Sequence, residues 1–184
     1  MIQELVQQIR DSTRAITEGM HTAVPGQVLK IYTEKCVADV HPVMKFRKRD
    51  GSTIDYPNVT GVPIVFPQVW GQQATIAFPV HAGDTGILII AEQSLDYWMY
   101  GHETETDLHF DLSDAIFIPG MWNKPNEVMT DALENDKIIV DTKGTRITVM
   151  DELVQIDSKQ VVINCEHTLI NGSITTINGF DSWN

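Results

Sequence analysis

Apolar residues near the start of the chain recur at helical spacing. They form one narrow stripe, the rest of the segment is polar, and Gly19 is a plausible stop signal. We therefore predict a helix over residues 2–18, within an N-terminal segment that covers residues 1–20. A helix of this length is marginal in water, so it needs a surface, either on its own domain or on a partner. The stripe consists of Ile2, Leu5, Val6, Ile9 and Ile16, with Thr13 where a bulky residue is missing.

From residue 24 onward the pattern changes to short apolar runs separated by turn signals. Two of these runs flank Asp50-Gly51, a dipeptide that favours a two-residue hairpin turn because it tolerates positive φ. Such a series of short strands is typical of a small antiparallel barrel or sandwich, which we place at residues 21–122. Residues 94–122 are less regular and predict a lid or short helix packed on the barrel. The expected strands cover residues 24–32, 36–40, 44–49, 52–56, 62–66, 74–80, 85–91 and 115–118.

The C-terminal part of the chain repeats every seven residues. It follows a polar stretch without a period, residues 123–136, which predicts a linker. Written from Val154, the repeats read VQIDSKQ, VVINCEH, TLINGSI and TTINGFD, and two looser copies, Ile138–Asp141 and Thr148–Asp151, precede them. The first position of each full repeat is β-branched: Val154, Val161, Thr168 and Thr175. The third position is always isoleucine: Ile156, Ile163, Ile170 and Ile177.

The residue types of this repeat favour strands over a coiled coil. A period of seven first suggests a coiled coil, but Val, Ile and Thr favour strands, and the Asp or Asn that follows favours a turn. One chain needs roughly 18 residues for each coil of a β-solenoid, whereas three chains with seven residues each supply enough. We therefore predict that residues 137–184 form an intertwined trimeric β-helix or β-prism, with the eight repeat residues above in its core. The alternative is an ordinary two- or three-stranded sheet with a chance repeat.

Charge and composition narrow the function classes. The 184 residues include 13 basic and 25 acidic side chains, a formal net charge of −12, which argues against a nucleic-acid partner and against docking on anionic lipid. The two cysteines, Cys36 and Cys165, form no disulfide framework and suit assembly in a reducing cytoplasm. We recognise neither a transmembrane run nor a signal peptide.

The predicted barrel contains four distinctive motifs. They are Val62-Pro-Ile-Val-Phe-Pro, His81-Ala-Gly-Asp-Thr-Gly-Ile-Leu, Glu92-Gln-Ser-Leu-Asp-Tyr-Trp, and Phe110-Asp-Leu-Ser-Asp-Ala-Ile-Phe-Ile-Pro-Gly. In this order they resemble the N-terminal domain of the baseplate central spike proteins of contractile-tailed bacteriophages. The resemblance covers residues 24–122. It implies an all-β protein in which an OB-fold antiparallel barrel is followed by a trimeric β-helical spike, with a short N-terminal α-helix.

The resemblance also implies a location and partners. The protein would belong to the virion, as a homotrimer at the tail baseplate, assembled in the host cytoplasm. It would sit under the tail tube, joined to hub proteins, and pierce the host outer membrane when the sheath contracts. The N-terminal segment would then dock on the hub through Ile2, Leu5, Val6 and Ile9.

One feature of the resembled family is missing at the C-terminus. Many members end in a His-x-His motif that binds a metal ion at the spike apex, whereas this chain ends in Gly179-Phe-Asp-Ser-Trp-Asn. We therefore expect no cofactor and no apical metal. Either the tip is blunt, or a separate small tip protein covers Phe180 and Trp183. We favour the second, since exposed aromatic residues on a three-fold face form a binding patch.

Few residues suggest catalytic or metal chemistry. His102 and His109, with three carboxylates between them, are competent metal ligands, but a solvated acidic loop explains them better. Asp111 and Asp114 resemble a glycosidase carboxylate pair, but the sequence around them favours a turn. Three copies of His167 could hold an ion on a trimer axis, although a position on the outside fits better. We expect no enzyme, and the alternative function is a trimeric carbohydrate-binding or carbohydrate-cleaving tail module.

Overall fold

The chain forms two compact units. The computed structural model describes residues 2–48, 50–101 and 108–172. The first unit covers residues 1–124 and the second covers residues 125–184. The predicted boundary after residue 122 lies two residues from the observed one. The two units are described separately below.

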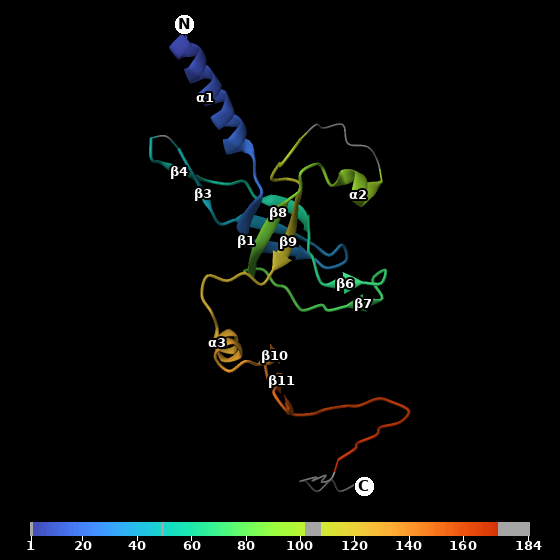
Figure 1. The fold of residues 1–184 in the computed structure, drawn as a ribbon. Helices are drawn as coiled ribbons and strands as arrows, with labels where there is room; N and C mark the ends of the chain where they lie inside the picture. Colours follow the sequence, from blue (N-terminus) through green and yellow to red (C-terminus); the bar gives the residue numbers. More distant parts are fainter. Residues whose placement is uncertain (1, 49, 102–107, 173–184) are drawn as a thin grey trace. The chain divides into compact units, whose positions relative to one another are not determined.

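The first unit begins with a helix and continues into a curled sheet. Helix α1 spans Ile2–Gly19, which confirms the predicted helix. Five strands then form one antiparallel sheet in the order β5-β2-β1-β8-β9, of which β1, β8 and β9 are labelled in Figure 1. Their bounds are Ala23–Tyr32 for β1, Val37–Pro42 for β2, Val59–Pro63 for β5, Thr85–Ile90 for β8 and Ala115–Pro119 for β9.

The two edges of this sheet approach one another. Ile64, directly after β5, forms a parallel bridge with Phe117 of β9. The N–H of the next residue, Val65, donates to the carbonyl oxygen of Phe117 across 2.9 Å. The sheet is therefore curled toward a barrel, and the prediction of a mainly β domain with antiparallel strands is confirmed.

A hydrophobic core fills the curled sheet. Alternate residues of β2 and β8 are buried, as expected for strands with one face on a core. Phe117 and Leu88 are completely buried, and partly buried side chains such as Phe66 and Val80 pack around the core. The first unit therefore holds a core of its own. The core residues are Val24, Val28, Ala38, Val40, Val59, Val62, Ile64, Leu88, Ile90, Leu112, Ala115 and Phe117.

Two hairpins extend from this sheet. Strands β3 (Lys45–Arg47) and β4 (Thr53–Asp55) confirm the hairpin predicted around Asp50-Gly51, but its turn is longer than two residues. The N–H of Lys48 donates to the carbonyl oxygen of Ser52, which encloses three residues. Strands β6 (Gln68–Val69) and β7 (Ala74–Thr75) form the second hairpin.

The predicted strand over residues 74–80 is wrong. Only Ala74–Thr75 pairs, and Ile76 and Phe78 are exposed outside the main sheet. The apolar alternation of residues 74–80 reflects local packing, because the ring of Phe78 contacts the ring of Phe66 edge to face with centroids 5.2 Å apart. The short helix expected after residue 94 is present as α2, Asp96–Tyr100. None of its residues is fully buried, but Tyr100 lines a pocket together with Tyr32 and Val37 of the sheet, so α2 lies against the surface of the curled sheet.

The second unit consists of a helix, a three-stranded meander and an extended tail. Helix α3 spans Glu127–Glu134, so the prediction of a linker without regular structure is wrong. The missed signal is the N-cap: the side-chain oxygen of Asn126 accepts from the N–H of Met129. Strands β10 (Ile138–Thr142), β11 (Thr145–Met150) and β12 (Leu153–Asp157) then pair antiparallel in chain order. Residues 158–172 form neither helix nor strand within the single chain.

We predict that Gly86→Ala destabilises the first unit. A Cβ atom at Gly86 would lie 2.6 Å from a ring carbon of Phe117, and closer still to the carbonyl oxygen of Ile118. Forcing atoms into a packed core costs about 1–3 kcal/mol of unfolding free energy. Guanidinium unfolding of the full chain should show a lower midpoint. The control is Gly19→Ala, where a Cβ meets nothing within 4 Å. Equal midpoints for the two variants would contradict this account of the core.

Candidate assembly interface

One face of the three-stranded meander is entirely apolar or uncharged. Residues that are partners across neighbouring strands share a face of the sheet. Val140 faces Ile147, which faces Ile156, and Ile138 faces Val149, which faces Val154. Six β-branched side chains therefore lie on one face, which we call the apolar face: Ile138, Val140, Ile147, Val149, Val154 and Ile156.

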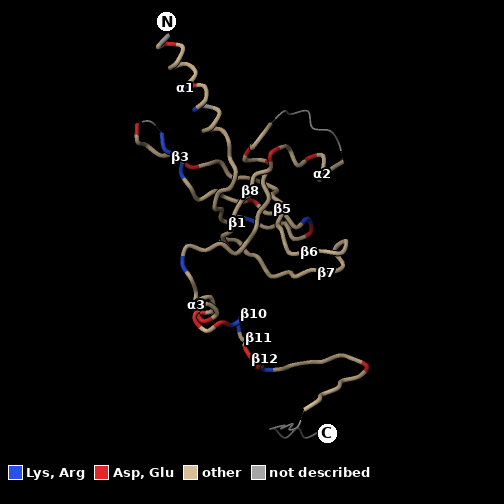
Figure 2. Tube along the Cα trace, in the orientation of Figure 1, with Lys and Arg blue, Asp and Glu red and all other residues tan. Residues whose placement is uncertain are grey.

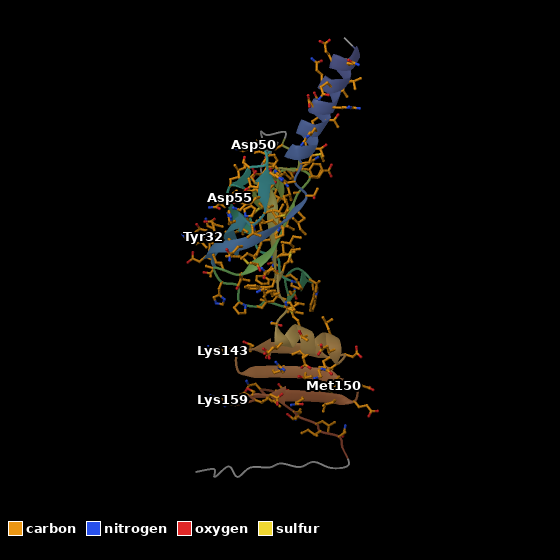
Figure 3. All side chains as sticks on the ribbon, turned by 90° about the vertical axis from the view of Figure 1, so that its left-hand side faces the viewer. Tyr32, Asp50, Asp55, Lys143, Met150 and Lys159 are labelled. Carbon is orange, nitrogen blue, oxygen red and sulfur yellow. The ribbon has the colours of Figure 1, made fainter. Side chains whose placement is uncertain are left out.

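The apolar face is uncovered in the single chain. Ile138 is 70% exposed, Val140 64% and Ile156 51%, and the other three members are also exposed. A continuous apolar patch of this kind is unusual on a soluble monomer and indicates an interaction surface. Figure 3 shows the three strands side by side, with Lys143 and Lys159 at one end and Met150 at the other.

The opposite face of the meander carries charges, and α3 lies against part of it. Thr148 is the one buried residue described in the second unit, and its neighbour on this face, Ile139, is half-buried. Asp131 of α3 reaches Arg146 of β11, with 3.8 Å between a carboxylate oxygen and a guanidinium nitrogen. This contact places α3 against the charged face. The apolar face therefore remains available for a partner.

A small ionic network fixes α3 to the sheet. The ammonium of Lys137 and the side-chain amide of Asn135 each donate to one oxygen of Asp131, both across 2.8 Å. Arg146 donates to Asp141 across 2.7 Å. The Lys137 bond, and after it the Asn135 bond, lower the pKa of Asp131 below its ordinary value. The bond to Asp141 raises the pKa of Arg146.

The predicted trimer core falls partly on this face and partly on the tail. Val154 and Ile156 belong to β12 and lie on the apolar face. Val161, Ile163, Thr168 and Ile170 lie in the extended tail, where they are exposed. The last two members, Thr175 and Ile177, lie outside the described residues, as do Phe180 and Trp183. The structure thus brings together only two of the eight predicted core residues within one chain.

Sequence reasoning missed four members of the apolar face. Ile138, Val140 and Val149 belong to the two looser copies of the repeat, which the prediction left out of the trimer core, and Ile147 directly precedes the second copy. Their signal is the period-two alternation, Ile138 with Val140 and Ile147 with Val149.

The apolar stripe of α1 and the histidines considered as metal ligands lie in different parts of the chain. Leu5, Val6 and Ile9 of α1 are exposed, and the side chain of Ile2 is not described. His102 also lies outside the described residues, while His109 and His167 are exposed. Within the described residues, no group of three or more His, Cys, Asp or Glu side chains is arranged to hold a metal ion. No described helix is both long and apolar enough to cross a membrane.

Asp111 and Asp114 are held in a turn and do not form a catalytic pair. One oxygen of Asp111 accepts from both the N–H and the hydroxyl of Ser113. These bonds lower the pKa of Asp111, whereas a glycosidase acid needs a raised one. Asp114 accepts from the N–H of Leu95. The turn interpretation of this motif is therefore confirmed.

Comparison with known protein families gives one match, and it falls on the curled sheet. The family described as Phage protein Gp138 N-terminal domain matches residues 24–120, more than half of the chain. No curated protein matches the chain. The match confirms the resemblance to phage spike-type proteins that the four motifs indicated.

We predict that acid weakens the second unit through Asp131. A carboxyl whose pKa is lowered by folding contributes stability that is complete above its unfolded value, about 3.9, and is lost as the pH falls through the lower folded value. Asp131→Asn should therefore flatten the drop in melting temperature between pH 5 and pH 2, measured by circular dichroism. Glu134→Gln, an exposed residue of the same helix, should leave the drop unchanged. The same steep drop in Asp131→Asn would argue against this role.

Proposed function

The chain belongs to the family of the phage protein Gp138 N-terminal domain, and from this premise we propose that it is a trimeric baseplate spike. This family membership supports a structural role in a phage particle. In the proposal, three chains form the central spike under the tail tube of a contractile tail. The spike is pushed through the host outer membrane when the sheath contracts.

The bare apolar face is the observation that carries the proposal. A sheet with one face on α3 and six exposed β-branched side chains on the other needs a second layer. Three copies around an axis would cover these faces with one another. Burying a Val or Ile side chain contributes about 1.5–3 kcal/mol, so eighteen such side chains would dominate the association energy.

The odd repeat length of the tail supports the same assembly. Along a straight strand, residues an even number apart share a face. Ile156, Ile163 and Ile170 are seven apart, so they can share a face only if the chain turns once in each repeat. The Asp or Asn that follows each isoleucine suits such a turn. Residues 158–172 take part in no strand pairing within the single chain, so in this proposal other chains supply their strand partners.

The first unit would link the spike to the tail hub. Its strand order, with the parallel contact between Ile64 and Phe117, supports an OB-type barrel. We assign hub docking to α1, whose residues Leu5, Val6 and Ile9 are exposed and need a cover. The same proposal assigns Ile2 to this face. The basic residues Lys45, Arg47 and Lys48 on the β3–β4 hairpin, blue in Figure 2, would meet an acidic neighbour in the baseplate.

The spike function is mechanical and needs no catalytic group or cofactor in this proposal. Three intertwined chains satisfy one another's backbone groups, so no chain can peel off alone under axial load. The net charge of −12 for each chain keeps the particle soluble. A separate tip protein would cover the C-terminal aromatic residues Phe180 and Trp183.

A carbohydrate-binding tail module is the second candidate. The observation that favours it is the aromatic surface of α2, where Trp98 is 77% exposed and Tyr97 and Tyr100 are also exposed. Exposed aromatic rings can stack on sugar rings. Hydrolysis is disfavoured because Asp111 and Asp114 are engaged in the turn.

A glycan screen with the full chain tests this second candidate. If it is correct, the wild type binds a cell-surface glycan and Trp98→Ala reduces the affinity at least tenfold. Phe78→Ala, an exposed aromatic residue away from α2, serves as the control. The spike proposal expects no glycan signal that depends on Trp98.

The oligomeric state tests the spike proposal directly. We expect sedimentation and light scattering to give three times the chain mass of 20.7 kDa. Ile156→Asp places three carboxylates together on the buried face, and each uncompensated buried charge costs several kcal/mol. This variant should therefore dissociate to monomers.

The matched control is Gln155→Asp. Gln155 is the neighbouring strand residue, and it lies on the opposite face of the sheet. The control should remain trimeric, which separates the effect of the face from the effect of the added charge. A monomeric wild-type chain, or equal trimer content in the two variants, would count against the proposal.

A further inference from the structure

We propose that α1 pairs with the α1 helices of two further copies of this chain as a parallel, three-stranded coiled coil. This inference rests on the proposed trimer and names the cover for the exposed helix stripe. It reassigns Ile2, Leu5 and Ile9 from the proposed hub contact to contacts between copies, and the hub would then meet the outer surfaces of the helices.

The spacing of the apolar residues follows a heptad. Ile2, Leu5, Ile9 and Ile16 are separated by three, four and seven residues, which places them at the a and d positions of a seven-residue repeat. Ser12 takes the remaining d position between Ile9 and Ile16. The residues of this seam that the structure describes are exposed; Ile9, for example, is 58% exposed.

The distribution of charge around the helix points to copies of the same helix. In this register every charged residue of α1 falls at b, c or f, away from the seam: Glu4, Arg10, Asp11, Arg14 and Glu18. The e and g positions are all uncharged: Val6, Gln8, Thr13 and Ala15. Two-stranded coiled coils usually carry charges at e and g. An uncharged face that is four positions wide can meet two neighbours without like-charge repulsion, as a three-stranded bundle requires.

The attachment of α1 to the barrel sets the direction and register of the helices. The N–H of His21 donates to the carbonyl oxygen of Phe110 across 3.1 Å, and the carbonyl oxygen of Thr22 accepts from the N–H of Ile90. Only Met20 separates this anchor from the end of α1 at Gly19. Three barrels placed around one axis therefore bring three helix ends together at the same height, with all helices parallel.

The seam is too weak to assemble without the rest of the trimer. The helix has two and a half heptads, and Ser12 replaces a large apolar residue at its middle. Short helices with so little apolar surface are marginal in water. The high local concentration created by the trimeric tail would supply what the seam lacks.

Cysteine pairing in the full chain tests this arrangement. The background carries Cys36→Ser and Cys165→Ser, and a single cysteine is introduced as Ile9→Cys at an a position or as Gln7→Cys at the outer f position. Oxygen with copper phenanthroline oxidises pairs of close thiols to disulfides. Denaturing gels then report the linked dimers. Both sites are exposed on α1, so neither change disturbs the core of the first unit.

We expect Ile9→Cys to form linked dimers at least ten times faster than Gln7→Cys. Because three thiols allow one disulfide, the reaction should stop with two thirds of the chains linked. Leu5→Cys, at a d position, should behave like Ile9→Cys. Equal rates at positions 9 and 7 in a protein that light scattering shows to be trimeric would overturn the coiled coil alone. A monomeric chain would overturn the coiled coil and the proposed spike together.

Discussion

The uncovered apolar face of the β10–β11–β12 meander is the constraint on which the interpretation of this protein depends. Three strands with one face against α3 cannot exclude water from the other face, and small sheets need apolar cover to be stable. In the first unit the sheet meets this requirement itself, because Phe117 and Leu88 are buried where β5 and β9 approach one another. In the second unit nothing described in the chain does so. The two units therefore differ: the first has a hydrophobic core of its own, whereas the second has an apolar face that no described part of the chain covers.

This difference suggests an order of assembly. The barrel can fold as soon as its strands are complete, because its contacts lie within one chain. The meander with α3 can form next, since the Asp131–Lys137 bond and the Arg146–Asp141 bond hold it together locally. In the proposed trimer, residues 158–172 would gain structure only when other chains provide strand partners, so their loss of conformational entropy would accompany association.

The sequence predicted the elements with strong local signals and missed those that depend on tertiary context. The alternation in β1, β2 and β8 was sufficient to place the curled sheet, and the turn signal at Asp50-Gly51 was sufficient to place the β3–β4 hairpin. The apolar alternation of residues 74–80 was misleading, because it reflects the contact between Phe66 and Phe78 and not pairing in the main sheet. Helix α3 was missed because it is only eight residues long and its start depends on one cap at Asn126. The apolar face was only partly found, since it depends on the register between three strands, which no single stretch of sequence encodes.

The placement of charges would allow this strongly acidic chain to associate with copies of itself as proposed. Residues 125–184 contain ten acidic and four basic side chains, which is −6, half of the net charge of the chain. On the meander, the charged residues Asp141, Arg146 and Asp157 are register partners and share the face on which α3 lies. The apolar face carries none, because its remaining positions are Thr142 and Thr145. Association through this face would therefore bury apolar surface without removing a charge from water, and that separation of charge from contact surface recurs on α1.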